Sequence, residues 1–130
     1  MRDPDTPPAP DAPSEAGTTA RLRIRIIFNP NAGLSRRGLF RRTLDALDAL
    51  GCEVWLHRTD GAGDAETIAR DLPACDRLVV AGGDGTMHEA LNGLRGRDLP
   101  VALIPLGTAN VLAREIGLRR DPAAVARTIV

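Results

Sequence analysis

Hydrophobic and polar residues alternate at residues 22–26, and the chain then becomes continuously apolar up to Phe28. This pattern predicts a β-strand that begins at a solvated edge and ends inside a sheet. Asparagine, proline and glycine follow at residues 29–33 and forbid a continuation of that strand. Further short strands are predicted at residues 53–56, 77–81 and 101–104 because each is a short run rich in apolar residues.

Between these strands, apolar residues recur at intervals of three and four, which is the period of one face of an α-helix. The predicted helices span residues 35–50, 64–71, 86–94 and 109–116, and a further helix begins at 121–122. Ser35 and Asp64 are expected to cap the first two helices, and Thr86 with Glu89 forms a capping box on the third. Asp121 followed by proline is typical of a helix start.

Four strand-then-helix units predict an α/β domain, a Rossmann-like three-layer fold with a parallel sheet. We expect the strand order 2-1-3-4, which places the loops after the first and third strands side by side. Ligands of such sheets bind beyond the carboxyl ends of the strands. The loops that leave those ends are therefore the candidates for function.

Residues 1–20 differ in composition from the rest of the chain. They hold five prolines and four acids, one arginine, and no Leu, Ile, Val, Phe or Trp. Such a segment buries too little apolar surface to fold, so it is predicted to be a disordered tail before one domain at residues 21–130. The chain shows no signal-peptide or membrane-spanning run, and its tail is not basic like a transit peptide. The expected location is the cytoplasm, with peripheral membrane contact left open.

The charge pattern excludes several classes of protein. The formal net charge is zero, divided into −3 for the tail and +3 for the remaining residues. That excess is too mild for a nucleic-acid-binding protein, and only three aromatic residues are available for stacking. All 17 basic residues are arginine, so the lysine-dependent Walker A and protein-kinase signatures are excluded. Cys52 and Cys75 lack metal-ligand spacing and are expected to be reduced, partly buried thiols.

The strongest chemical signal is Gly82-Gly-Asp-Gly-Thr86, between the third strand and the third helix. Three glycines in four positions allow a close approach of the backbone or a positive φ, and the helix start favours anions. Asp84 would repel bare phosphate, so it suggests Mg²⁺ or the hydroxyl of a phosphate acceptor. The alternative is a tight turn that binds nothing. The dinucleotide fingerprint G-x-G-x-x-G is excluded because it would require glycine at His88.

Two other loops repeat this combination of glycine, hydroxyl and amide groups. They are Asn29-Pro-Asn-Ala-Gly33, after the first strand, and Pro105-Leu-Gly-Thr-Ala-Asn110, after the fourth. Arg36 and Arg37 follow the first of these loops and could neutralise phosphate. The alternative is that they belong, with Arg41 and Arg42, to a solvated helix face.

Together, the three motifs resemble the catalytic domain of diacylglycerol and sphingosine kinases over residues 24–117. The resemblance implies the N-terminal domain of an NAD kinase/diacylglycerol kinase-like fold, with ATP and Mg²⁺ bound and Asp84 near the metal or the acceptor hydroxyl. The residues implied to bind the nucleotide are Asn29, Pro30, Asn31, Ala32, Gly33, Thr59, Gly82, Gly83, Asp84, Gly85, Thr86, Met87, His88, Glu89, Gly107, Thr108 and Asn110.

The implied function is transfer of the γ-phosphoryl group of ATP to a lipid hydroxyl, such as that of diacylglycerol, at a membrane surface. Family members continue into a β-rich second domain that supplies much of the lipid site and a carboxylate assigned as base. This chain is therefore expected to be truncated at its C-terminus and to have little or no activity alone. It departs from many bacterial members at His88, where they have asparagine, and at Val111, where they have aspartate.

Two other functions stay open. One is an NAD kinase-like enzyme acting on a small molecule, and the other is a nucleotide-binding module without catalysis. His88 is expected at the second or third position of its helix and is not assigned as a base.

Overall fold

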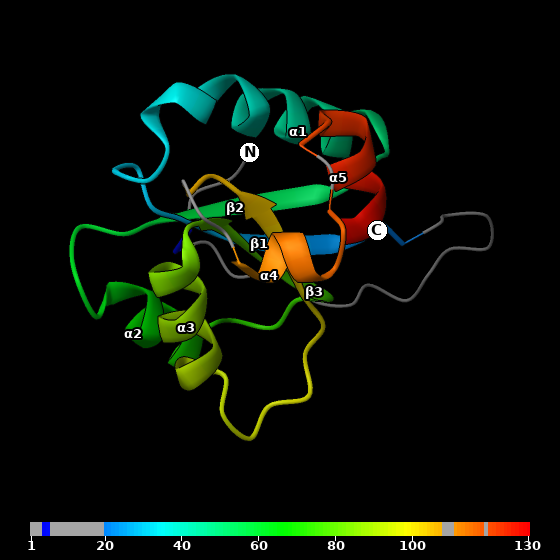
Figure 1. Ribbon diagram of the computed structural model, residues 1–130. Coiled ribbons are helices and arrows are strands. Elements are labelled where there is room, and N and C mark those ends of the chain that lie inside the picture. The colour runs from blue at the N-terminus through cyan, green and yellow to red at the C-terminus, as the bar shows by residue number, and fades with distance from the viewer. Residues whose placement is uncertain (1–3, 6–19, 108–110, 119) are drawn as a thin grey trace.

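A parallel four-stranded sheet forms the centre of the domain in the computed structural model, which describes residues 4–5, 20–107, 111–118 and 120–130 (Figure 1). The strands are β1 (Arg23–Phe28), β2 (Glu53–Arg58), β3 (Arg77–Gly82) and β4 (Val101–Pro105). Their order is β2-β1-β3-β4 and all pairs are parallel, so the predicted α/β class and strand order are confirmed. In register, Ile26 pairs with Leu56 on one side and Val79 on the other. Most of the predicted tail lies outside the described residues.

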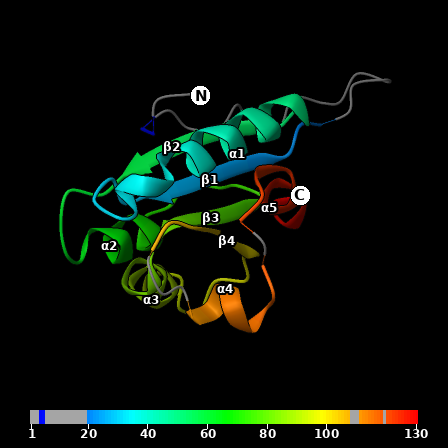
Figure 2. The same cartoon turned by 45° about the horizontal axis from the view of Figure 1, so that its top comes forward.

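Helices cover both faces of the sheet and complete three layers. They are α1 (Arg37–Ala49), α2 (Asp64–Arg70), α3 (Asp84–Gly93), α4 (Val111–Glu115) and α5 (Pro122–Ile129), with a 3₁₀ turn at Leu34–Arg36 before α1. Figures 1 and 2 show α1 and α5 on one face of the sheet and α2 and α3 on the other.

Side chains of β1 point alternately to the two faces of the sheet, so this strand contributes to both hydrophobic cores. Ile24 and Ile26 are fully buried with Leu47 and Ile129 on the α1/α5 side. Ile27 is fully buried on the α2/α3 side. A strand that is buried on both faces reads as a continuous apolar run, which explains why the sequence pattern identified it.

Two of the helix caps expected from the sequence differ in the structure, and a third is confirmed. Ser35 was expected to cap the first helix, but it lies in the 3₁₀ turn and makes no capping hydrogen bond. Asp64 is the first residue of α2 rather than its cap, and its carboxylate accepts hydrogen bonds from the backbone N–H groups of Asp60 and Gly61 at 2.7 and 2.9 Å. The Asp121 cap on α5 is confirmed by a 3.0 Å hydrogen bond from the backbone N–H of Ala124.

Arg25 is completely buried, so the solvated edge expected at the start of β1 is wrong at this residue. Its guanidinium donates to the Pro4 carbonyl at 3.1 Å, lies 3.0 Å from His57 Nε2 and stacks 4.9 Å from the centroid of the Trp55 ring. Hydrogen bonding and the contact with an aromatic face offset part of the desolvation of the charge, and burial still lowers the pKa of Arg25.

Burial, and then the neighbouring Arg25 guanidinium, lower the pKa of His57 from 6.5 to about 4. The folded state therefore favours neutral His57, and we expect stability to be lost as pH falls from 6.5 to about 4. The full shift corresponds to at most about 3 kcal/mol, which solvent screening at this half-buried ring reduces to roughly 1–2 kcal/mol. The measurement is urea unfolding at pH 7 and pH 4.5, followed by the fluorescence of Trp55, the only tryptophan.

His57→Gln should remove that part of the pH dependence, and exposed His88→Gln should leave it unchanged. An equal pH dependence in both variants would contradict the role given to His57.

The two cysteines are free thiols, as predicted, with Cys52 buried and Cys75 partly buried. None of the helices in the described residues is long and apolar enough to cross a membrane.

Candidate functional site

Loops from neighbouring strands meet at the carboxyl edge of the sheet. The backbone N–H of Asn29 donates to the Ala81 carbonyl at 3.0 Å, and that of Leu106 donates to the Gly82 carbonyl at 3.2 Å. The loops that follow β1, β3 and β4 therefore lie side by side, as the predicted strand order requires.

Gly33 brings the first of these loops into direct contact with the loop after β4. Its backbone is left-handed, with φ 59°, and a Cβ added there would lie 1.8 Å from the Leu106 carbonyl oxygen. The Arg36 guanidinium donates a hydrogen bond to the Gly107 carbonyl across the same junction. Only glycine satisfies both the backbone angle and the close approach, so this residue fixes how the two loops meet.

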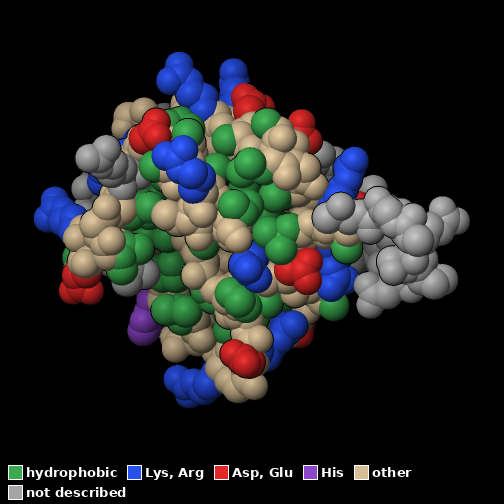
Figure 3. All heavy atoms as spheres, turned by 90° about the vertical axis from the view of Figure 1, so that its right-hand side faces the viewer, with side chains coloured by type: hydrophobic (Ala, Val, Ile, Leu, Met, Phe, Trp, Pro, Cys, Tyr) green, Lys and Arg blue, Asp and Glu red, His purple; other side chains and the backbone are tan. Residues whose placement is uncertain are grey.

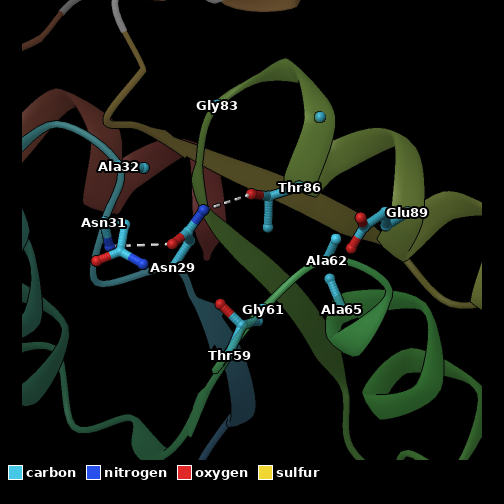
Figure 4. Close-up of a pocket in the computed structure, with 11 residues that line it drawn as sticks. Asn29, Asn31, Ala32, Thr59, Gly61, Ala62, Ala65, Gly83, Thr86 and Glu89 are labelled. Carbon is cyan, nitrogen blue, oxygen red and sulfur yellow. Dashed lines mark hydrogen bonds between the residues drawn. The ribbon is translucent and has the colours of Figure 1, made fainter.

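A pocket of about 400 Å³, here called the edge pocket, opens at this edge of the sheet among the loops that follow β1, β2 and β3 (Figure 4). It is lined by Asn29, Asn31, Ala32, Thr59, Gly61, Ala62, Ala65, Gly83, Gly85, Thr86 and Glu89. Its volume falls within the range of small-molecule sites, and it combines alanine and glycine surfaces with convergent amide and hydroxyl groups. The loop after β2 and the start of α2 form one wall, facing the start of α3 (Figure 4).

Asn29 joins two walls of the edge pocket. Its side-chain amide donates to the Thr86 hydroxyl at 3.3 Å, and its side-chain oxygen accepts from the backbone N–H of Asn31 at 3.0 Å (Figure 4). The second bond folds the β1 loop onto itself, and the first attaches that loop to α3. Both ends of the amide are used, so the side chain is held in one orientation.

The capping box predicted at residues 86–89 is wrong because α3 begins two residues earlier than expected, at Asp84. Thr86 and Glu89 therefore lie inside the helix and bind other segments. The Glu89 carboxylate accepts a 3.0 Å hydrogen bond from the backbone N–H of Gly63, which ties α3 to the loop after β2. The same shift makes His88 the fifth residue of α3, where its side chain is exposed.

The three glycines of the loop after β3 differ in whether the structure requires glycine at that position. None of them has a positive φ. A Cβ at Gly82 would lie 2.9 Å from the Thr86 side chain, whereas a Cβ at Gly83 would make an ordinary 3.6 Å contact with Gly107. A Cβ at Gly85 would meet nothing within 4 Å, although Gly85 lines the edge pocket. A tight turn therefore explains Gly82 but leaves Gly85 unexplained.

Asp84 lies between two lining residues but does not itself line the edge pocket. Its carboxylate accepts a 3.0 Å hydrogen bond from the backbone N–H of Val111, the first residue of α4. The described ranges contain no group of three or more His, Cys, Asp or Glu side chains that could hold a metal. Within the third loop, Asp84 is the one carboxylate that could hold a divalent ion.

Charge in the edge pocket is sparse. Glu89 is the only ionisable residue among those that line it in the described part of the chain. The Arg36 guanidinium donates to the Gly107 carbonyl and Arg37 lines a different hollow, so neither residue lines the edge pocket. The start of α3 lies at the pocket through Gly83, Gly85 and Thr86, and helix N-termini attract anions through their free N–H groups.

The structure brings together eight of the residues implied by the sequence resemblance. Asn29, Asn31, Ala32, Thr59, Gly83, Gly85, Thr86 and Glu89 line the edge pocket. Those that do not line it are Pro30, Gly33, Gly82, Asp84, Met87, His88 and Gly107. Thr108 and Asn110 lie outside the described residues. The sequence analysis missed Gly61, Ala62 and Ala65, which form the wall of the edge pocket after β2. The glycines in the loop after β2 were the only sequence feature that could have indicated this wall.

A parallel sheet with helices on both faces and a pocket among the loops at its carboxyl edge defines an α/β domain whose candidate ligand site lies at that edge. Within that class, the chain belongs to the diacylglycerol kinase catalytic domain family, whose model matches residues 23–130.

Its relatives include a diacylglycerol kinase from Bacillus subtilis (strain 168), which is 38% identical over 117 residues. That match covers 83% of this chain but only 38% of the relative. Sphingosine kinase B from Dictyostelium discoideum is 33% identical over 124 residues, covering 88% of this chain and 16% of the relative. A crystal structure of a diacylglycerol kinase from Bacillus anthracis str. Sterne superposes with a TM-score of 0.72 at 29% identity, covering 85% of this chain and 42% of that one. The chain therefore spans less than half the length of these relatives.

Proposed function

We propose that this domain binds ATP in the edge pocket and forms the nucleotide-binding half of a lipid kinase. The kinase transfers the γ-phosphoryl group of ATP to a lipid hydroxyl such as that of diacylglycerol. The observation that carries the proposal is Gly85 at the start of α3, which lines a 400 Å³ pocket and where an added Cβ would meet nothing within 4 Å. Membership of a kinase family and relatives named diacylglycerol kinase and sphingosine kinase support it.

The lining residues divide the edge pocket into two chemical regions. Ala62 and Ala65 offer an apolar wall suited to a nucleoside base, and the backbone at Gly83 and Gly85 offers N–H groups suited to phosphates. Phosphoryl transfer needs alignment and charge stabilisation more than covalent chemistry from the protein. Mg²⁺ bound with ATP would supply the positive charge that the pocket lacks, with Asp84 as its protein carboxylate.

The acceptor side of the reaction is assigned to a second domain. The chain covers only 38% of its Bacillus subtilis relative, and we propose that a longer protein supplies the lipid site and the base. Figure 3 shows hydrophobic side chains gathered over the middle of the face that carries α5, which suits contact with a further domain. Val130, at the end of α5, is 47% exposed, and Ile116, after α4, is 62% exposed. The isolated chain should therefore show little or no lipid kinase activity.

Isothermal titration with ATP, with and without Mg²⁺, tests the nucleotide site. We expect Mg²⁺ to strengthen ATP binding to the wild type, and Asp84→Asn to weaken binding in Mg²⁺ by about ten- to hundredfold because a charged ligand is lost. Asparagine keeps an oxygen that can accept from the Val111 N–H, so α4 stays anchored.

The matched control is Asp98→Asn at an exposed site, which should bind ATP as the wild type does. Failure of both the wild-type chain and its full-length parent to bind ATP would refute the proposal.

A further inference from the structure

The wall of the edge pocket that follows β2 consists of a loop and the first turn of α2. Its lining residues are Thr59, Gly61, Ala62 and Ala65. Ala65 is fully buried and Thr59 is 6% exposed, whereas Gly61 and Ala62 between them are exposed. An exposed stretch of glycine and alanine buries too little apolar surface to hold one shape against the entropy of the chain. Polar contacts must therefore fix the middle of this wall.

Asp64 makes those contacts, although its side chain does not line the edge pocket. One oxygen of its carboxylate accepts from the backbone N–H of Asp60 at 2.7 Å and from that of Gly61 at 2.9 Å. The backbone N–H of Asp64 in turn donates to the Gly61 carbonyl at 3.3 Å. Hydrogen bonds to an ionised acceptor are the strong ones, and here two of them close the turn on itself.

The two ends of the same loop are held by other segments. At its start, the backbone N–H of Thr59 donates to the Phe28 carbonyl of β1 at 2.9 Å. At its end, the backbone N–H of Gly63 donates to the Glu89 carboxylate of α3 at 3.0 Å. The carboxylate of Asp64 therefore controls the stretch that lies between two fixed points.

The same hydrogen bonds decide which chemical groups the wall offers to a ligand. Four backbone N–H groups of the loop already donate to other groups of the domain, and they belong to Thr59, Asp60, Gly61 and Gly63. A loop that binds phosphate must instead direct its N–H groups at the anion. The wall therefore suits an apolar ring packed on Ala62 and Ala65, while the start of α3 on the facing side suits phosphate (Figure 4).

We infer that Asp64 is a positioning residue that makes the edge pocket select a nucleoside triphosphate over a bare polyphosphate. Its carboxylate holds the wall in shape for the base and occupies two N–H groups that would otherwise be open to an anion. This role rests on the proposed binding of ATP in the edge pocket. Asp64 itself touches no ligand, and its effect passes through the backbone of Asp60 and Gly61.

Isothermal titration with ATP and with inorganic tripolyphosphate, both in Mg²⁺, tests this role. The wild type should bind ATP more tightly than tripolyphosphate. Asp64→Ala should weaken ATP binding by about tenfold, because the ligand must then order the loop. Its affinity for tripolyphosphate should change by less than about twofold, because phosphates bind at the start of α3. Asp64→Asn keeps an oxygen that can accept from both N–H groups, so its ATP affinity should fall less.

The matched control is Asp121→Ala. It also removes a carboxylate that accepts a backbone N–H, that of Ala124 at 3.0 Å. Asp121 caps α5, which covers the opposite face of the sheet from α2 (Figure 1). The control should lower the stability of the domain and leave both affinities unchanged. The fluorescence of Trp55, the only tryptophan, shows whether each variant is folded.

Hydrogen exchange on the wild type gives a second test that depends on no variant. Asp60 and Gly61 are exposed residues, but their N–H groups should exchange more slowly than those of an unstructured chain because Asp64 holds them. ATP should slow both further by packing on the wall, and tripolyphosphate should leave both unchanged.

Equal losses of ATP and tripolyphosphate affinity in Asp64→Ala would overturn the inference, since the residue would then support the whole pocket and not the choice of ligand. Unchanged ATP affinity in that variant would overturn it too, as would equal effects of Asp64→Ala and Asp121→Ala. Equal protection of the Asp60 and Gly61 N–H groups by the two ligands would also count against it. A wild-type chain and full-length parent that bind neither ligand would instead refute the proposed function, and with it the basis of this role.

Discussion

Gly33→Ala should destabilise the domain by about 2–4 kcal/mol, a large share of the stability of a domain of this size. A left-handed backbone costs an alanine about 1 kcal/mol, and crowding a packed site costs about 1–3 kcal/mol more. The crowding is specific, because the added Cβ would lie 1.8 Å from the Leu106 carbonyl oxygen, a backbone atom that cannot rotate away. Chemical unfolding followed by the fluorescence of fully buried Trp55 measures the loss.

Gly51→Ala is the matched control for that substitution. Gly51 also has a positive φ, 79°, but a Cβ there would meet nothing within 4 Å. It should therefore cost only the backbone contribution of about 1 kcal/mol. The difference between the two variants isolates the contact between the loops after β1 and β4. If the two losses are equal, that contact does not hold the loops together.

The sheet could be predicted from the sequence because its signals are local. Buried parallel strands are short apolar runs such as residues 77–81, and the connection between parallel strands is usually a helix, so the alternation of strands and helices along the chain followed. The start of α3 could not be predicted in the same way. Thr86 and Glu89 have the correct spacing for a capping box, but their partners are Asn29 and Gly63, which lie far away in sequence. Only the folded chain offers those partners.

The site could be predicted only in part, because some of its lining residues are of types that carry no chemical signal in a sequence. Loops rich in glycine and amide groups carry a chemical signal, and the loops after β1 and β3 do meet at the edge pocket. Ala62 and Ala65 form another wall, but alanine carries no chemical signal in a sequence. Arg25 reads as a surface residue, and only its contacts with Pro4, Trp55 and His57 show how a buried guanidinium is accommodated.

Gly85→Val should separate ligand binding from folding. Gly85 is the second residue of α3 and has open space where a side chain would project, so valine should change the free energy of unfolding by less than about 1 kcal/mol. Because Gly85 lines the edge pocket, we expect the added side chain to narrow the pocket beside the start of α3. Crowding a bound ligand there by about 1–3 kcal/mol corresponds to a loss of ATP affinity of roughly 10- to 100-fold, measurable by isothermal titration.

Gly38→Val is the control because Gly38 is the second residue of α1 and a Cβ added there would also meet nothing within 4 Å. The two variants place the same side chain at equivalent helix positions, and only one of them lines the edge pocket. Unchanged ATP affinity in Gly85→Val would mean that the glycine-rich loop is only a turn between β3 and α3. Loss confined to Gly85→Val would mean that this position is kept open for a ligand, since neither packing nor backbone angle requires glycine there.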